Sequence, residues 1–198
     1  MSEFYDRLTD FSRTASPSAR NRIEAELWEK HGVEQAVFIL DLSGFSKGTD
    51  QHGIVHFLAL IQQMRTLLKP LVEDHRGDVV KFEADNCFAR FSDPLDAVRA
   101  AVECNQALSA MNERVHRDFE INASVGIDFG WILLVKQTDY YGMPVNIASK
   151  LGEDTARPGQ ILVTDRVIKK VGSSSGFATR PHMVSIYDLD IEAHEILY

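Results

Sequence analysis

The feature that most constrains the fold is a short apolar segment that runs directly into a carboxylate. Residues 37–40 read Val-Phe-Ile-Leu, and Asp41 follows them before a Ser-Gly turn. A second carboxylate, Asp85, stands near the tip of a predicted hairpin over residues 78–91. An ionised carboxylate beside an apolar core must be paired, hydrogen-bonded or bound to a metal. Two such carboxylates at strand ends suit Mg²⁺, which prefers one or two carboxylates together with substrate phosphates. Nucleotide chemistry is therefore the first hypothesis.

Length, charge and cysteine content narrow the class of protein. The chain has 198 residues, of which 44% are hydrophobic and 25% charged, as expected for one soluble globular domain. Its net charge of -8 argues against a nucleic-acid binder, whose affinity depends on neutralising phosphates. Cys87 and Cys104 lie in apolar segments and predict buried free thiols in a reducing compartment. With no span-length apolar run and no signal-peptide core, we expect a cytoplasmic protein that does not bind membranes.

The chain divides into a polar, helix-forming extension over residues 1–35 and a domain over residues 36–198. In the extension, a break near residues 14–18 precedes a helix that Ser18 or Asn21 starts. In the domain, the pattern predicts a strand at about 36–42, a helix at 54–71 that Pro70 kinks or ends, the hairpin at 78–91, a helix capped by Ser92 or Asp93, strands at 120–128 and 131–136 joined by a turn at Phe129 and Gly130, a helix at 144–152, a strand at 160–164 and edge strands after 177.

This element order predicts the fold class. Strands and helices are interleaved, yet two hairpins require antiparallel pairing. An α+β fold with a ferredoxin-like mixed sheet and helices packed on it satisfies both conditions.

A third set of polar residues lies in and just before the predicted helix at 144–152. Asn146 and Lys150 are four residues apart, so they share one helix face, and Asp139 stands just before the helix. This arrangement suits a polar ligand. The alternatives are a solvated helix face for Asn146 and Lys150 and a turn-starting role for Asp139.

Together the three segments resemble the class III nucleotidyl cyclase catalytic domain, the family of adenylate and guanylate cyclases. The family's opening motif, Phe-x-Asp-(Ile/Leu)-x-Gly-Phe, matches at Asp41, Gly44 and Phe45. Its Lys-x-x-Gly-Asp motif matches residues 81–85, with alanine in place of glycine. Its Asp-x-x-Gly-x-x-Val-Asn-x-Ala-x-Arg motif matches residues 139–150, with lysine in place of the final arginine.

The resemblance implies how phosphate and metal are bound. Asp41 and Asp85 would hold two divalent ions, Mg²⁺ or Mn²⁺. The backbone N–H groups of Leu42, Ser43, Gly44 and Phe45 would cradle phosphate.

The resemblance also implies the substrate, the remaining roles and the assembly. Lys81 and Asp139 would read the purine edge, with a donor and an acceptor that suit the adenine of ATP. Asn146 would orient the ribose, and Lys150 would stabilise the charge that develops on the phosphate. The product would be cyclic AMP, formed with release of pyrophosphate in a homodimer whose sites are shared between subunits.

Other interpretations stay open at this point. Lysine lacks the planar fork with which arginine binds phosphate oxygens, so a catalytically impaired nucleotide-binding or regulatory module is one alternative. A palm-type nucleotidyltransferase with the same two metals is another. Taken singly, Asp41 would be a helix N-cap or a turn acid, and Lys81 a strand-edge lysine whose stem covers apolar surface.

Overall fold

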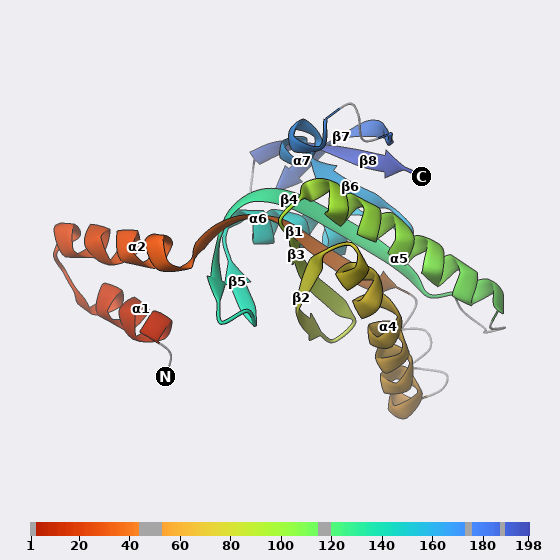
Figure 1. The fold of residues 1–198 in the computed structure, drawn as a ribbon, viewed down its shortest axis with the longest axis horizontal. Coiled ribbons are helices and arrows are strands. Elements are labelled where there is room, and N and C mark those ends of the chain that lie inside the picture. Colours follow the sequence, from red (N-terminus) through yellow and green to blue (C-terminus); the bar gives the residue numbers. More distant parts are fainter. Residues whose placement is uncertain (1–2, 44–52, 115–119, 173–175, 187–188) are drawn as a thin grey trace.

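The protein is a mixed β-sheet with helices packed against it, as the computed structural model shows in Figure 1. The structure describes residues 3–43, 53–114, 120–172, 176–186 and 189–198. Along the chain the elements are α1 (Glu3–Arg13), α2 (Pro17–His31), β1 (Gly32–Ser43), α4 (Ile54–Asp74), β2 (Gly77–Glu83), β3 (Asn86–Phe91), α5 (Pro94–Arg114), β4 (Asn122–Val135), β5 (Asp139–Tyr141), α6 (Met143–Ser149), the π-helical segment η1 (Lys150–Thr155), β6 (Ile161–Thr164), α7 (Asp165–Val171), β7 (Ala178–Ile186) and β8 (Leu189–Leu197).

The sheet has the strand order β2-β3-β1-β4-β6-β8-β7, and β5 pairs with β4. Only the β4–β6 pair is parallel among the described strands. The α+β, ferredoxin-like mixed sheet expected from the element order is thus confirmed. The expectation of edge strands after residue 177 holds only for β7, because β8 lies between β6 and β7.

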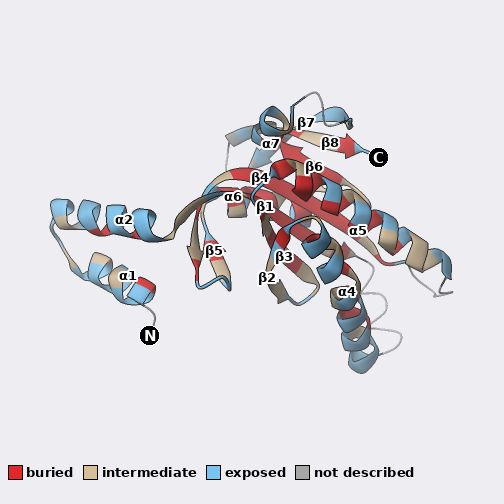
Figure 2. Ribbon diagram, in the orientation of Figure 1, coloured by how far each residue is buried: buried red, intermediate tan, exposed pale blue. Residues whose placement is uncertain are grey.

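The two faces of the sheet carry different helices. Successive side chains of a strand point to opposite faces. Along β1, Phe38 and Leu40 pack in the large core formed with α4, α5 and α7, whereas Val37 and Ile39 pack with Ala148 of α6. Figure 2 shows this burial concentrated in the central strands and the inward faces of α4 and α5. By the same alternation, Asp41 lies on the face that α6 covers.

Two glycines let α6 and η1 press closely onto the sheet. A Cβ atom on Gly126 would lie 2.0 Å from the carbonyl oxygen of Ala148 and 2.5 Å from the amide nitrogen of Gly152. A Cβ on Gly152 would in turn meet the Gly126 nitrogen at 2.9 Å. Both positions therefore need glycine, and this contact places the segment that begins with Lys150.

Helices α1 and α2 lie to one side of the main sheet (Figure 1), where Phe4, Ile23 and Leu27 pack with Val135 at the end of β4. The predicted start of the second helix at Ser18 or Asn21 is wrong, because the helix begins at Pro17. Ser16 is its cap and accepts a hydrogen bond from the Ala19 amide at 3.4 Å. Proline suits the first helical position, where its missing N–H costs nothing.

The two strands predicted at 120–128 and 131–136 are one continuous strand, β4. Phe129 and Gly130 pair with Ala36 and Gln35 of β1, so no turn occurs there. The chain reverses instead at Lys136 and Gln137, whose φ values of 52° and 60° are those of a type I′ turn. No Asn-Gly or Asp-Gly pair marks this turn in the sequence.

Two further boundaries differ from expectation. Of the two predicted effects of Pro70, an early end of α4 is wrong, because the helix continues to Asp74 with Val72 buried beyond the proline; a kink stays a prediction. Strand β1 begins at Gly32 rather than near residue 36, since its first residues pair with β4. The predicted cap of α5 is confirmed, with Asp93 accepting from the Leu95 amide at 2.9 Å.

Candidate active site

The structure brings the two strand-tip acids together. Asp41 pairs across β1 and β3 with Asn86, the residue that follows Asp85. The pKa of Asp41 is raised to about 6, first by burial and then by the negative charges of Asp85, Glu153 and Asp154. Glu153 and Asp154 come from η1 and were not identified from the sequence. Three further carboxylates are therefore close enough to Asp41 to raise its pKa.

Asp85 is presented by a turn that favours glycine. Ala84 has a φ of 49°, in the left-handed region that residues with a Cβ atom rarely adopt. Its carbonyl oxygen accepts a hydrogen bond from Arg65 Nη2 at 2.9 Å, which helps hold the turn in place. The predicted hairpin with Asp85 near its tip is thus confirmed, and the alanine adopts the conformation that glycine would adopt more easily.

The donor set at this edge fits a hard divalent cation. Asp41 and Asp85 offer carboxylate oxygens, and the Oδ1 atom of Asn86 is buried and accepts no hydrogen bond from the described residues. Burial, together with the charges of Asp154, Asp85 and Glu83, outweighs a hydrogen bond from Ser149 and raises the pKa of Glu153. Oxygen-only ligands with an excess of negative charge are what Mg²⁺ and Mn²⁺ prefer.

Lys81 and Asp139, the predicted base-reading residues, form the second part of the candidate site. Lys81 of β2 and Asp139 of β5 form an ion pair with 3.4 Å between Nζ and Oδ1. Lys81 also lies 3.2 Å from a carboxylate oxygen of Glu83 and 5.1 Å from the centre of the Phe88 ring. A donor and an acceptor from different strands are thus placed side by side.

Asp139 is fixed by several hydrogen bonds. Its Oδ1 accepts from the Tyr140 amide at 3.0 Å, and its Oδ2 accepts from the Tyr141 hydroxyl at 2.7 Å. Burial alone would raise the pKa of Asp139, but these two hydrogen bonds and the charge of Lys81 outweigh it and lower the pKa. Asp139 is therefore an ionised acceptor at neutral pH.

The helix predicted at 144–152 is α6 followed by the π-helical η1. Asn146 is exposed on α6. Lys150 begins η1 and forms an ion pair with Asp154, with 2.7 Å between Nζ and Oδ2. Ser149 donates to Glu153 at 3.1 Å, so Glu153 contacts the last residue of α6 and Asp154 contacts the first residue of η1. The only sequence signal for this pairing was the four-residue spacing of Lys150 and Asp154.

The predicted phosphate cradle is described only in part. Gly44 and Phe45 lie outside the described residues. Leu42 and Ser43 still belong to β1 and pair with Ala123 and Asn122 of β4. The Ser43 hydroxyl donates to the Asn122 carbonyl oxygen at 3.3 Å.

One buried carboxylate escaped the sequence analysis. Asp128 of β4 is fully buried and accepts hydrogen bonds from Thr164 Oγ1 at 2.6 Å, the Phe129 amide at 2.8 Å and Arg166 Nε at 3.1 Å. Burial raises its pKa, and these partners oppose the shift. These partners belong to β6, to α7 and to β4 itself, so we infer that Asp128 joins β4 to β6 and α7.

A separate group of possible metal ligands lies where β8 meets α7. The ligand atoms of Asp165, Glu192 and His194 lie within 4.8 Å of one another. Lys169 already forms an ion pair with Asp165. We therefore assign this group to local charge pairing, at a different place in the fold from Asp41 and Asp85.

The chain was also compared with known proteins. Residues 29–186 match the model of the adenylate and guanylate cyclase catalytic domain. The chain belongs to this family. Among the described residues of this cyclase domain, no helix is long and apolar enough to cross a membrane.

Two curated relatives of the cyclase domain are longer proteins. "Putative adenylate cyclase 3" of Rhizobium meliloti (strain 1021) is 30% identical over 132 residues, which cover 67% of this chain and 22% of that protein. An uncharacterised protein of Mycobacterium tuberculosis (strain ATCC 25618 / H37Rv) is 27% identical over 180 residues, which cover 90% of this chain and 46% of that protein. The chain thus spans less than half the length of either relative.

Solved cyclase structures share the fold. The adenylyl cyclase CyaB from P. aeruginosa superposes with a TM-score of 0.75 at 15% identity, over 84% of this chain and 96% of that chain. The adenylate/guanylate cyclase/hydrolase from Silicibacter pomeroyi gives 0.71 at 25% identity, over 84% and 98%. A rhodopsin-guanylyl cyclase core with converted specificity, solved with ATPalphaS, gives 0.72 at 17% identity, over 84% and 98%.

Proposed function

We propose that this cyclase domain is an adenylate cyclase that converts ATP into 3′,5′-cyclic AMP and pyrophosphate. In this reaction the ribose 3′-oxygen loses its proton and attacks the α-phosphorus, and the bond from that phosphorus to the pyrophosphate oxygen breaks. Residues 36–198 would form the catalytic domain, and residues 1–35 an extension that precedes it. A cytoplasmic location agrees with the buried, unpaired thiols of Cys87 and Cys104.

The observation that carries the choice of ATP is the Lys81–Asp139 pair at 3.4 Å. Adenine presents an amino group at position 6 and an acceptor nitrogen at position 1, which complement a carboxylate and an ammonium group. Guanine presents the reverse order, an oxygen at position 6 and an N–H at position 1. Guanine would find complementary partners only if Lys81 faced position 6 and Asp139 faced position 1, that is, if the two side chains exchanged places. A site built to hydrogen-bond one pattern rejects the other strongly because its polar groups are then left unpaired.

Asp41 and Asp85 would bind two divalent ions, Mg²⁺ or Mn²⁺. Bound ions would supply neutralisation of the triphosphate and activation of the 3′-hydroxyl. The backbone of Leu42, Ser43, Gly44 and Phe45 would orient phosphate oxygens. Asn146 would orient the ribose, and Lys150 would stabilise charge on the phosphate undergoing attack. Positioning and electrostatics of this kind account for most of the rate in phosphoryl transfer.

The assembly we propose is a homodimer with two shared sites. Among the described elements, α4, α5 and α7 cover one sheet face, while α6 and η1 cover the other. The exposed Asn146 lies on that second side. A second copy on this side would bring its Lys81, Asp139, Asn146 and Lys150 to the Asp41 and Asp85 of the first. A fungal guanylyl cyclase domain with a related fold is described as a non-canonical dimer.

The experiment is an assay of the purified protein with ATP or GTP and Mn²⁺ or Mg²⁺, with cyclic nucleotides measured by mass spectrometry. The proposal expects cyclic AMP from ATP and at most a small amount of cyclic GMP. Efficient formation of cyclic GMP alone would overturn the choice of substrate.

The ion pair between Lys150 and Asp154 supports a second candidate function, a nucleotide-binding module with impaired catalysis. Lysine replaces the family's arginine there, and its charge is engaged within its own chain. This candidate expects ATP binding in calorimetry without any cyclic AMP, a result that separates it from a slow enzyme.

A further inference from the structure

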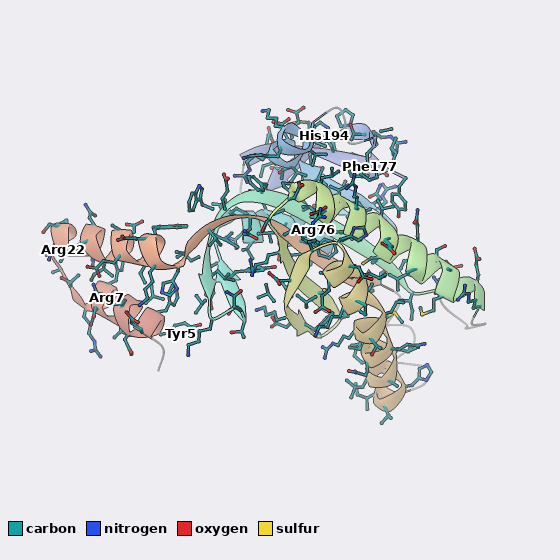
Figure 3. All side chains as sticks on the ribbon, in the orientation of Figure 1. Tyr5, Arg7, Arg22, Arg76, Phe177 and His194 are labelled. Carbon is teal, nitrogen blue, oxygen red and sulfur yellow. The ribbon has the colours of Figure 1, made fainter. Side chains whose placement is uncertain are left out.

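A chain of hydrogen bonds joins the N-terminal helix α1 to the proposed base-reading pair. The Tyr5 and Tyr141 hydroxyl oxygens lie 3.2 Å apart, although 136 positions separate the two residues in the sequence. Tyr141 donates to Asp139 Oδ2 at 2.7 Å, and Asp139 Oδ1 lies 3.4 Å from Lys81 Nζ. Figure 3 labels Tyr5 on the side of α1 that is nearer to β5. A residue of the extension is thus two hydrogen bonds from Asp139.

The chemistry of the partners sets the direction of these bonds. An ionised carboxylate only accepts hydrogen bonds, so the Tyr141 hydroxyl must donate its proton to Asp139. Tyr141 can then only accept from Tyr5, which makes Tyr5 the donor. The hydrogen bonds with Tyr5 and Asp139 raise the pKa of Tyr141, so the hydroxyl keeps its proton at neutral pH.

Aromatic packing holds Tyr141 against α1. Tyr141 is 41% exposed, but the Phe4 ring stacks on it with centroids 6.2 Å apart and an interplanar angle of 6°. Phe4 itself is buried, with its ring edge-to-face against His31 at 5.0 Å. Phe4 also belongs to an apolar cluster with Ile23, Leu27 and Val135. Burial of Phe4 therefore fixes α1 on the β4–β5 hairpin and restricts the Tyr141 ring.

Asp139 needs such support to act in recognition. The terminal torsion of an aspartate is broad, so a partly exposed carboxylate does not hold one orientation by itself. The side chain of Asp139 is 30% exposed. The Tyr140 amide holds one of its oxygens, and the Tyr141 hydroxyl is the donor among the described side chains that holds the other. A second lone pair on Oδ2 is left for the amino group of a base.

We propose that Tyr141 is a positioning residue for base recognition, and that α1 sets its orientation through Tyr5 and Phe4. The inference rests on the proposed role of Asp139 as a reader of the purine. It assigns the extension a direct effect on substrate selection. Loss of the Tyr141 hydroxyl would leave the ring packing intact and release the carboxylate of Asp139.

The test compares two adjacent tyrosines. Tyr141→Phe removes the hydroxyl that holds Asp139 and keeps the stacked ring. Tyr140→Phe is the matched control, because its hydroxyl contacts the Ala89 carbonyl oxygen at 3.4 Å and not Asp139. Binding of a non-cyclisable ATP analogue and of the matching GTP analogue is measured by calorimetry, alongside kcat and KM for both nucleotides.

Tyr141→Phe is expected to weaken binding of the ATP analogue about tenfold, as for loss of support to one charged hydrogen bond. It should raise KM more than it lowers kcat and reduce the preference for ATP over GTP. Tyr5→Phe should produce a smaller change in the same direction. Tyr140→Phe should preserve the wild-type preference. An unchanged preference and affinity in Tyr141→Phe, or an equal change in Tyr140→Phe, would overturn the inference.

A third readout separates this inference from the proposed function. The carboxyl group of Asp139 is titrated by carbon NMR in the wild type and in Tyr141→Phe, without nucleotide. The pKa of Asp139 should rise in the variant, because a hydrogen bond to the ionised form is lost. A wild-type protein that binds neither nucleotide rejects the proposed function. An unchanged Asp139 pKa in a folded variant rejects the positioning contact.

Discussion

Lys150 and Asp154 form an ion pair at the point where α6 passes into η1, with 2.7 Å between Nζ and Oδ2. The same Asp154 contributes to the raised pKa of Asp41. One aspartate of η1 thus acts electrostatically on both the proposed charge-stabilising lysine and a proposed metal acid. A phosphate that recruits Lys150 must compete with Asp154 for its ammonium group.

The first prediction concerns the side chain at position 150. Lys150→Arg should raise kcat or leave it unchanged, because arginine adds a bidentate fork for phosphate oxygens. Lys150→Ala should lower kcat roughly 10²-fold, as expected for loss of one transition-state donor. Lys169→Ala is the matched control, since Lys169 pairs with Asp165 at the same spacing on α7. Steady-state kinetics measure the effect, and equal activity in all variants would place Lys150 outside the site.

The second prediction concerns the metal acids. Asp41→Asn and Asp85→Asn should each abolish metal-dependent turnover, because each removes the charge of a proposed metal ligand. Both proteins should still fold, as judged by circular dichroism. Binding of Mn²⁺ without nucleotide, measured by paramagnetic resonance, should weaken in both. Asp190→Asn, at an exposed position of β8, should match the wild type. Normal turnover in either site variant would disprove the two-metal assignment.

The third prediction tests the shared sites. Asp41→Ala and Asn146→Ala should each be inactive alone, because every site of each homodimer lacks one part. Random mixing makes half of the dimers mixed, and each mixed dimer has one intact site. Activity should therefore return to about a quarter of wild type. Continued inactivity despite demonstrated subunit exchange, or a monomeric active enzyme, would contradict the arrangement.

The fourth prediction concerns Asp128. Asp128→Ala should lower the free energy of unfolding by about 3 kcal/mol, because it leaves Thr164 and the Phe129 amide without their buried acceptor. Urea denaturation at constant slope measures the loss. Asp78→Ala is the control, since Asp78 pairs with Arg90 while its side chain is 66% exposed. That variant should cost less than about 1 kcal/mol. Equal losses would show that burial of Asp128 does not matter.

The fifth prediction concerns the thiols. Burial raises the pKa of Cys87 to about 12 and also raises that of Cys104. At pH 8 both sulfurs are thus protonated in the folded protein, and only a thiolate reacts with iodoacetamide. Native protein should be alkylated slowly, and protein in urea rapidly, as followed by mass spectrometry. Rapid labelling of the native protein would show that these sites are accessible.

Much of the site was predictable from short stretches of sequence. The turn at Ala84 and Asp85, the Asp93 cap and the helix that carries Asn146 all depend on residues within a few positions of one another. Local backbone preference and helix periodicity decide such features, so their signals survive in the sequence alone.

Other features depended on contacts between distant residues. The strand pairing with β1 carries β4 straight through Gly130, where local chemistry indicated a turn. Gly126 and Gly152 bring η1 onto the sheet, and Glu153 of η1 lies close enough to Asp41 to raise its pKa. Tyr5 meets Tyr141 only because Phe4 is buried on the β4–β5 hairpin. The sequence by itself determined the membership of the family and the residues proposed to carry the chemistry. The tertiary structure decided which charges and hydroxyls surround them, because packing energy depends on neighbours in space that local patterns do not encode.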